Sequence, residues 1–202
     1  TPIFLGLMFA SCKTKVPTEQ ISEVEKLRQR LVAATGSYTL FGHQDAMAYG
    51  IGWKGEYMQS DVKKVAGSFP ALFGWEIGHI GDSVNIDNVP FDSIRAYVQR
   101  IHEMEGIVTI SWHARSPLSG SSSWDVDTLV VEHILPGAAY HDAFKAKLDL
   151  VADFLNSLKT NDGVKIPIIF RPWHEMNGEW FWWGEGHRTH EQYKQLFRYT
   201  ID

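Results

Sequence analysis

Residues 166–184 have the sequence IPIIFRPWHEMNGEWFWWG, and they say most about how this chain folds. The stretch begins with a short apolar run, residues 166–170, which is the pattern of a buried strand. Arginine, histidine, glutamate and asparagine follow directly, together with a group of tryptophans. Burying an isolated charge is costly unless the charge is paired or its pKa shifts. Polar residues at the exit of an apolar strand therefore indicate a functional site on a rigid scaffold.

Three segments upstream share this character, since each is short and largely apolar and is followed by polar residues. Together with residues 166–170, the predicted strands are residues 38–43, 69–75 and 107–111. The predicted helices, marked by apolar residues at helical spacing, lie near residues 21–31, 60–65, 94–101 and 144–158. Thr18 is predicted to cap the first helix, Gly36 to end it, and Thr189 to open a last helix.

This alternation of strand and helix predicts βαβ units and a parallel sheet. A barrel places its active site on the face formed by the carboxyl ends of all its strands, whereas an open sheet binds ligands mainly at one crevice. Because all four predicted strands end in polar clusters, we favour the α/β class with a (β/α)₈ TIM barrel. A complete barrel takes about 250 residues, so these 202 residues are predicted to carry about the first four βα units.

The composition is that of a soluble globular protein, with 44% hydrophobic and 21% charged residues. The net charge of −5 and the lack of a basic stripe give no support to a nucleic-acid partner. The sequence shows no phosphate-binding glycine loop, no nucleophilic serine elbow and no CxxC motif. Eight tryptophans among 13% aromatic residues are many, and indole rings stack well on the flat faces of sugars. The composition therefore favours a carbohydrate site.

Cys12 is the only cysteine, so no internal disulfide can form. It follows an apolar segment, residues 3–11, that is too short to span a membrane but about as long as the apolar region of a signal peptide. The small residues before Cys12 resemble a bacterial lipoprotein cleavage box; the alternative is a buried strand ending in an inert cysteine. We expect residues 1–17 to be a signal remnant and tether lipidated on Cys12, and residues 18–202 to be part of a catalytic domain.

That assignment predicts an exported protein, in the periplasm or anchored to the outer membrane of a Gram-negative bacterium. The protein would then touch a membrane only through its lipid anchor. We expect the full-length protein to be monomeric.

Glu175 is the leading catalytic candidate, because most glycosidases use two carboxyl groups, one of which protonates the leaving oxygen. A glutamate beside aromatic rings can have its pKa raised toward the working pH. His174 could orient a carboxylate or bond a sugar hydroxyl, or it could be a core histidine. Arg171 could hold a partner carboxylate or form a structural ion pair, and Asn177 could bond a sugar or cap the next segment. Glu76, at the exit of residues 69–75, could be a second carboxylate.

Aromatic residues flank these polar groups. Trp112 and His113 follow the third predicted strand and could bind sugar, although Trp112 could equally cap the core. Trp180, Trp182 and Trp183 cannot all face one way, so one or two are expected to form a sugar-binding surface while the others pack.

Four histidines, His43, His79, His113 and His174, stand at predicted strand exits, which leaves a binuclear metal hydrolase as an alternative. The zinc motif H-E-x-x-H requires a second histidine where this chain has Gly178, and the strand-end H-x-H pair is missing as well. We therefore expect no metal and no cofactor.

Four motifs resemble those of glycoside hydrolase family 26, best known for endo-β-1,4-mannanases. Residues 170–184, FRPWHEMNGEWFWWG, are similar to the acid/base motif of that family. Residues 41–45, FGHQD, 74–78, GWEIG, and 110–115, ISWHAR, are similar to its first three strand exits. The resemblance covers about residues 36–202.

The resemblance implies a (β/α)₈ barrel that hydrolyses β-mannan with retention of configuration through a double displacement. It places the acid/base on Glu175, and it places the nucleophile on a glutamate after the seventh strand, beyond these four units. His113 and His174 match positions that bond the sugar beside the cleavage point, and Trp180 and Trp183 fall in the region of aromatic subsites.

We therefore interpret the chain as about the first half of an exported retaining endo-β-1,4-mannanase acting on mannan or galactomannan, and expect the chain alone to be inactive. One alternative is a β-1,3-1,4-glucanase or β-xylanase of the same family. Another is a non-catalytic protein that binds glycans in the same aromatic cleft. Should the chain alone prove active, Glu76 and Asp45 are the first candidates for a nucleophile.

Overall fold

The structure is a computed structural model that describes residues 21–126 and 129–202. Its centre is a four-stranded parallel sheet in the order β1-β4-β5-β6. The strands are β1 Gly42–Gln44, β4 Leu72–Glu76, β5 Ile107–Trp112 and β6 Ile168–Pro172. Each of the four predicted strands is present, and each pairs with its neighbour in the chain. This is the arrangement of successive βα units, as the alternating pattern predicted.

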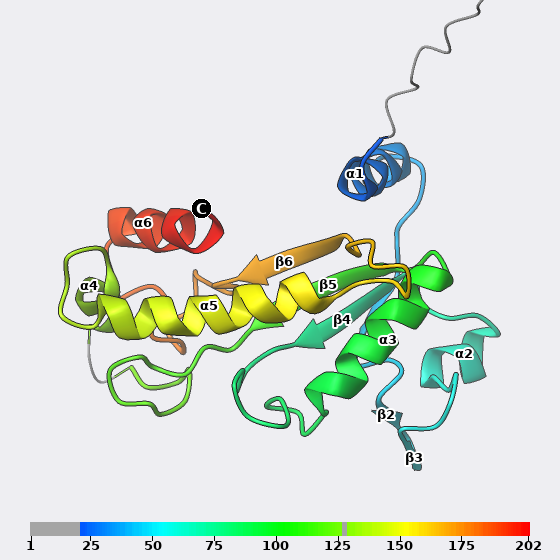
Figure 1. The fold of residues 1–202 in the computed structure, drawn as a ribbon, viewed down its shortest axis with the longest axis horizontal. Helices are drawn as coiled ribbons and strands as arrows, with labels where there is room; N and C mark the ends of the chain where they lie inside the picture. The colour runs from blue at the N-terminus through cyan, green and yellow to red at the C-terminus, as the bar shows by residue number, and fades with distance from the viewer. Residues whose placement is uncertain (1–20, 127–128) are drawn as a thin grey trace, which may run out of the picture.

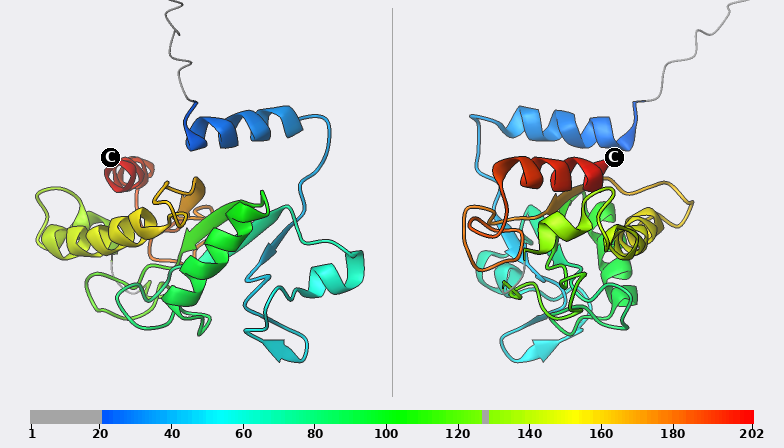
Figure 2. Two further views of the ribbon diagram at one scale, coloured as in Figure 1. Left: turned by 45° about the vertical axis from the view of Figure 1, so that its right-hand side comes forward. Right: turned by 90° about the vertical axis from the view of Figure 1, so that its left-hand side faces the viewer.

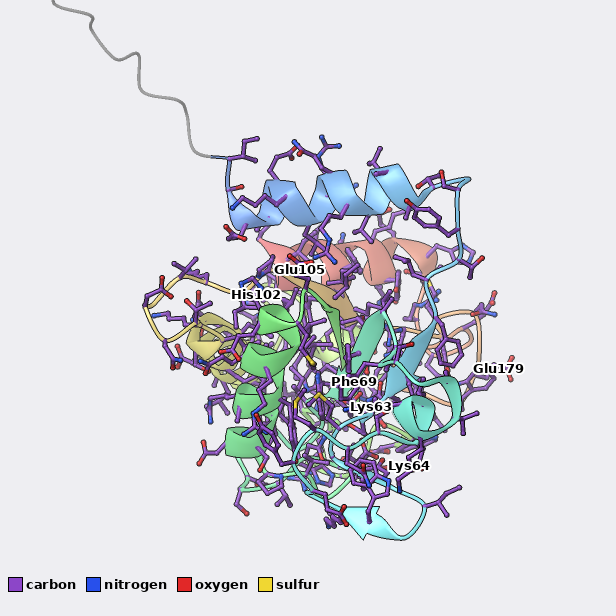
Figure 3. The ribbon with its side chains drawn as sticks, turned by 90° about the vertical axis from the view of Figure 1, so that its right-hand side faces the viewer. Lys63, Lys64, Phe69, His102, Glu105 and Glu179 are labelled. Atoms are coloured by element: carbon purple, nitrogen blue, oxygen red, sulfur yellow. The ribbon has the colours of Figure 1, made fainter. Side chains whose placement is uncertain are left out.

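Six helices accompany this sheet within the described residues. They are α1 Glu23–Ala34, α2 Asp61–Ala66, α3 Phe91–Glu103, α4 Val130–Ile134, α5 His141–Ser157 and α6 His190–Ile201. The helices α3 and α5 lie side by side over one face of the sheet (Figure 1), while α1 lies apart from them (Figure 2). In Figure 3, α1 passes above Glu105, and Arg30 of α1 donates a hydrogen bond to the Glu105 carbonyl. Helix α1 therefore sits at the amino ends of the strands, away from their carboxyl ends.

Alternation along β5 separates the core from the opposite face of the sheet. Val108, Ile110 and Trp112 are buried in one apolar core together with residues of α3 and α5, such as Ile94 and Phe144. The intervening residues of the strand point to the other face, because successive side chains of a strand alternate. Burial of each large apolar side chain contributes about 1.5–3 kcal/mol, so this core fixes the sheet against its helices.

The first helix differs from its prediction at its start. It begins after Ser22, whose hydroxyl accepts a hydrogen bond from the Glu25 N–H. Its last residue is Ala34, and the cap Thr35 is followed by Gly36 with φ 74°, so the prediction that Gly36 ends the helix is confirmed. Thr18, the predicted cap, lies outside the described residues. Of the apolar residues that marked the helix, Ile21 and Val24 are exposed and Leu27 is buried. Ala34, the last residue of the helix, is buried as well, so two buried positions hold this helix in place.

Three short elements were not predicted. Strands β2 Tyr49–Gly50 and β3 Trp53–Lys54 form an antiparallel hairpin that projects from the body of the chain (Figures 1 and 2). Helix α4 has five residues, too few for helical spacing to be recognised in a sequence. The first sheet strand is also displaced, because pairing with β4 begins at Gly42 and residues 38–41 precede it.

Candidate active site

Three strands bring their polar ends together at one edge of the sheet. Glu76 closes β4 opposite Ser111 of β5, and Trp112 of β5 lies opposite Pro172 of β6. His113 therefore follows β5 at the same edge at which His174 follows β6. The convergence of these strand exits, predicted from the sequence, is confirmed by the register.

Glu76 is 2% exposed, yet its carboxylate is surrounded by donors. Oε1 accepts hydrogen bonds from the backbone N–H groups of Gly78 and His113, both at 2.6 Å. Oε2 accepts one from the Ser111 hydroxyl at 2.6 Å and lies 2.9 Å from Nδ1 of His113 in an ion pair. Burial alone would raise the pKa of Glu76, but the contacts with His113 and Ser111 outweigh it, so the pKa is lowered and the carboxylate stays ionised.

His113 and His174 touch through their imidazole rings. Their Nε2 atoms are 3.2 Å apart, and the rings meet edge to face with centroids 4.5 Å apart. Burial alone would lower the pKa of His113, but the contact with Glu76 and its negative charge raise it above the ordinary value. The pKa of His174 is lowered, first by burial and then by the charge of His113. Of the two rings, His113 therefore binds a proton more readily.

Glu175 is exposed beside this pair, and its side chain is held by a neighbouring indole. The Trp180 Nε1–H donates to Oε2 of Glu175 at 2.8 Å, and the Gly178 N–H donates to the Glu175 carbonyl at 2.9 Å. This arrangement leaves the carboxyl open to a ligand from one side. A glutamate held in this way can donate or accept a proton at a bound sugar.

The backbone around His174 is unusual. Trp173 and Glu175 have φ angles of 53° and 55°, in the left-handed region that side chains other than glycine rarely adopt. Helix α6 stabilises this turn, because Tyr193 donates its hydroxyl to the Trp173 carbonyl and the Trp173 indole donates to Thr200. Strained positions of this kind occur where surrounding structure enforces them, and here they flank His174, between a buried Trp173 and an exposed Glu175.

Two of the predicted sugar-binding residues are core residues instead. Trp112 is 3% exposed and packs against Trp173. Trp183 is fully buried, and its indole donates to the His174 carbonyl at 2.8 Å. Their rings support the site from behind, so neither offers a face to a sugar. Trp182, which is also fully buried, donates to the Ala114 carbonyl and has the same supporting position.

The remaining predicted residues lie on the open side. Trp180 is 49% exposed beside Glu175, so its position fits the prediction of a sugar contact. Arg171 is exposed and donates from Nε to Oγ1 of Thr109 at 2.9 Å; its predicted carboxylate partner stays a prediction. Asn177 is exposed, and its role also stays a prediction.

Trp124 was missed by the sequence analysis. Its ring stacks on His113 with centroids 5.5 Å apart and an interplanar angle of 14°, and it is 49% exposed. Trp124 and Phe181 also touch, so the two rings cover one side of the His113 imidazole. The only local signal in the sequence is a tryptophan beside the serine run of residues 119–123.

Among residues 21–126 and 129–202, no three His, Cys, Asp or Glu side chains gather in a way that could hold a metal ion. His113 and His174 form an imidazole pair, and His113 is paired in turn with the carboxylate of Glu76. What the site can offer chemically is therefore proton transfer and hydrogen bonding beside exposed indole rings.

Comparison with known proteins identifies relatives of this chain. The family model for glycosyl hydrolase family 26 matches residues 16–202. A mannan endo-1,4-beta-mannosidase of Bifidobacterium adolescentis is 38% identical over 168 residues, which are 80% of this chain and 16% of that protein. A mannan endo-1,4-beta-mannosidase of Bacillus subtilis is 32% identical over 164 residues, which are 71% of this chain and 43% of that protein.

Solved structures agree with these relatives. A family 26 beta-mannanase from Bacteroides ovatus superposes with a TM-score of 0.87 and 44% identity, over 90% of this chain and 54% of that chain. An endo-beta-1,4-mannanase from Cellulomonas fimi superposes with a TM-score of 0.81 and 32% identity, over 89% of this chain and 41% of that chain. The chain thus spans about half the length of these structures. With its sheet of successive βα units as part of a (β/α)₈ barrel, this chain belongs to glycosyl hydrolase family 26.

Proposed function

We propose that this chain carries the acid/base half of a retaining endo-β-1,4-mannanase. Family membership and the similarity to mannan endo-1,4-beta-mannosidases support a glycoside hydrolase that acts on mannan. The observation that carries the proposal is the position of Glu175, exposed at the end of β6, held by Trp180 and directly beside the His113–His174 pair.

In this mechanism Glu175 protonates the oxygen of the leaving mannosyl group while a second carboxylate attacks the anomeric carbon. A covalent glycosyl-enzyme forms, and Glu175 then takes a proton from the water that releases the product. Retention requires the two carboxyl groups to lie about 5–5.5 Å apart. The resemblance to family 26 implies that the second carboxylate comes from a later strand of the barrel. Glu76 is poorly suited to attack, because it is buried and its oxygens are already engaged.

The test is Glu175→Ala in the full-length protein, assayed on two kinds of mannoside. Substrates with a poor leaving group need protonation, so their turnover should fall by about 10²–10⁴-fold, the usual contribution of general acid catalysis. Substrates with an activated leaving group need little protonation, and their glycosylation step should fall much less. Equal losses on both kinds would contradict the acid/base role. Parallel assays on mannan, mixed-linkage glucan and xylan decide which polysaccharide is hydrolysed.

We further propose that the protein is exported as a lipoprotein anchored through Cys12 and acts as a monomer. The support is the apolar segment of residues 3–11 followed by Cys12, which lies outside the described residues. Within the residues that the structure describes, no helix is long and apolar enough to cross a membrane.

In a Gram-negative host, with the native leader in place, we expect the full-length protein to fractionate with membranes and to carry an acyl group on Cys12. Cys12→Ala should abolish acylation and release the protein from the membrane fraction. Mass spectrometry that finds an unmodified Cys12 in the mature protein from the membrane fraction would refute the lipoprotein assignment.

A further inference from the structure

The chain contains a buried carboxylate, Glu76, that the proposed reaction does not use. Glu76 is 2% exposed, and its two carboxylate oxygens are contacted by Gly78, Ser111 and His113. Burying a charge costs free energy, and even a buried carboxylate with several donors often stabilises a fold no more than an apolar residue would. We therefore look for a role of this charge other than stability. Within the described residues its one cationic contact is His113, and His113 touches His174, the residue before Glu175.

We propose that Glu76 is a positioning residue that acts through His113: it keeps the positive charge of the histidine pair on His113, and so keeps His174 neutral and fixed beside Glu175. This inference rests on the proposed function, because it concerns how the acid/base site is organised. It adds to that function a residue that touches neither substrate nor Glu175.

The argument starts from the distance between the two rings. At 3.2 Å, the two Nε2 atoms fit a hydrogen bond, which requires a proton on one nitrogen and a lone pair on the other. Two N–H groups facing one another would repel. The pair can therefore hold one shared proton between the rings, and the groups on the outer nitrogens decide which ring is charged.

The outer nitrogens have opposite surroundings. Nδ1 of His113 lies 2.9 Å from the Glu76 carboxylate, which stabilises a charged ring. Neither Nδ1 has a hydrogen bond of good geometry in the described residues, but no carboxylate there forms an ion pair with His174, so nothing compensates a positive charge on its ring. An imidazolium on His174 would leave a charged group unpaired in the interior, which is strongly unfavourable.

The other charged groups around the pair act on both rings. Asp87, from the loop after β4, and Glu175, after β6, each favour a proton on His113. On His174, Glu76 and Glu175 favour a proton and Arg171 of β6 disfavours one, but burial and the charge of His113 outweigh the two carboxylates. The uncharged neighbours are the rings of Trp124 and Phe181, which shield His113 from solvent.

The consequence concerns the pH dependence of the reaction. If Glu76 holds the charge on His113, the raised pKa of His113 keeps the pair singly charged to a higher pH than an ordinary histidine would allow. Without the Glu76 charge, His113 would lose its proton at lower pH. His174, next to Glu175, would then no longer accept a hydrogen bond from the charged His113 ring. As the pH is raised, activity should then begin to decline at a lower pH than it does in the unsubstituted protein.

The experiment uses the full-length protein labelled with ¹⁵N-histidine, and follows the ring nitrogens of both histidines by NMR as a function of pH. In the unsubstituted protein, His113 should titrate above the ordinary value of about 6.5 and His174 below it. In Glu76→Gln, the His113 titration should move to lower pH. The alkaline limb of kcat/KM should move with it, and kcat should fall about 10- to 100-fold while KM changes little.

Two further variants complete the test. Asp82→Asn removes an exposed carboxylate paired with Arg115 and should leave both histidine titrations and kcat unchanged. Ser111→Ala removes one hydrogen bond to the Glu76 oxygen that pairs with His113 but keeps the charge, so the His113 titration should stay above the ordinary value or move to higher pH. If Glu76→Gln does not fold, Ser111→Ala decides: a His113 titration that falls to or below the ordinary value in that variant overturns the proposal.

Two other outcomes would overturn it. One is a His113 titration at or below the ordinary value in the unsubstituted protein. The other is a loss of kcat in Glu76→Gln with an unshifted His113, which would mean a purely structural role. Failure of the proposed function can be told apart from failure of this inference. The unsubstituted protein would then not hydrolyse mannan, while the histidine titrations would still test whether Glu76 acts on His113.

Discussion

Asp45, the residue after β1, combines a buried carboxyl with a left-handed backbone, φ 51°. Oδ2 accepts a hydrogen bond from the Tyr49 hydroxyl at 2.9 Å, while Oδ1 is buried without a partner in the described residues. Burial raises the pKa of Asp45 to about 6, and the charges of Asp87 and Glu76 act in the same direction. In the unfolded chain the carboxyl would titrate near its ordinary value, about 3.9.

The sign of the effect on stability follows from that difference. An acid whose folded pKa is raised stabilises the folded state below its unfolded pKa, and this stability is lost as the pH rises through the folded pKa. The unfolding free energy of full-length Asp45→Asn, taken relative to that of the unsubstituted protein, should therefore increase by about 3 kcal/mol between roughly pH 4 and pH 8. Thermal or denaturant unfolding across this range measures the difference. Tyr49→Phe should raise the pKa further and shift the window upward; a pH-independent difference for Asp45→Asn would contradict the assignment.

Single residues of the site were predictable to different degrees. Glu175, His113 and His174 follow predicted strands directly, so the sequence placed them at the correct edge of the sheet. The burial of Trp112 was also within reach, because it shares strand parity with the core residues Val108 and Ile110. The role of Glu76 was not, since it depends on contacts with Ser111 and His113, which are 35 and 37 residues away.

At the scale of elements, strong periodicity and explicit caps gave the most accurate predictions. Thr189 was predicted to open the last helix, and it caps α6 through a capping box with Gln192. The hairpin of β2 and β3 was not predicted because each strand has only two residues. Its one local signal in the sequence is Gly52, which has φ 78° in the turn. Elements held by long-range pairing or by few buried residues, such as β1 and α1, had shifted boundaries.

At the scale of the whole molecule, the sheet has two free edges within the described residues. Strand β1 pairs only with β4 there, and β6 only with β5. An apolar cavity of about 780 Å³ adjoins the β1 edge, lined by residues that include Phe41, Val62 and Phe69. Ile51 and Val65 beside it are 88% and 90% exposed. Unpaired strand edges together with exposed apolar surface favour association between molecules.

We therefore expect the purified 202-residue chain to associate and to show no measurable hydrolysis of mannan, since the resemblance to family 26 implies that the nucleophile comes from a later strand of the barrel. A longer chain that supplies the remaining strands should be monomeric and active under the same conditions. Light scattering and a reducing-sugar assay on both chains measure the two properties. Robust hydrolysis by a monomeric 202-residue chain would refute this expectation. Variants of Asp45 and Glu76 would then be the first to examine, although both side chains are buried and Glu76 is already engaged by His113.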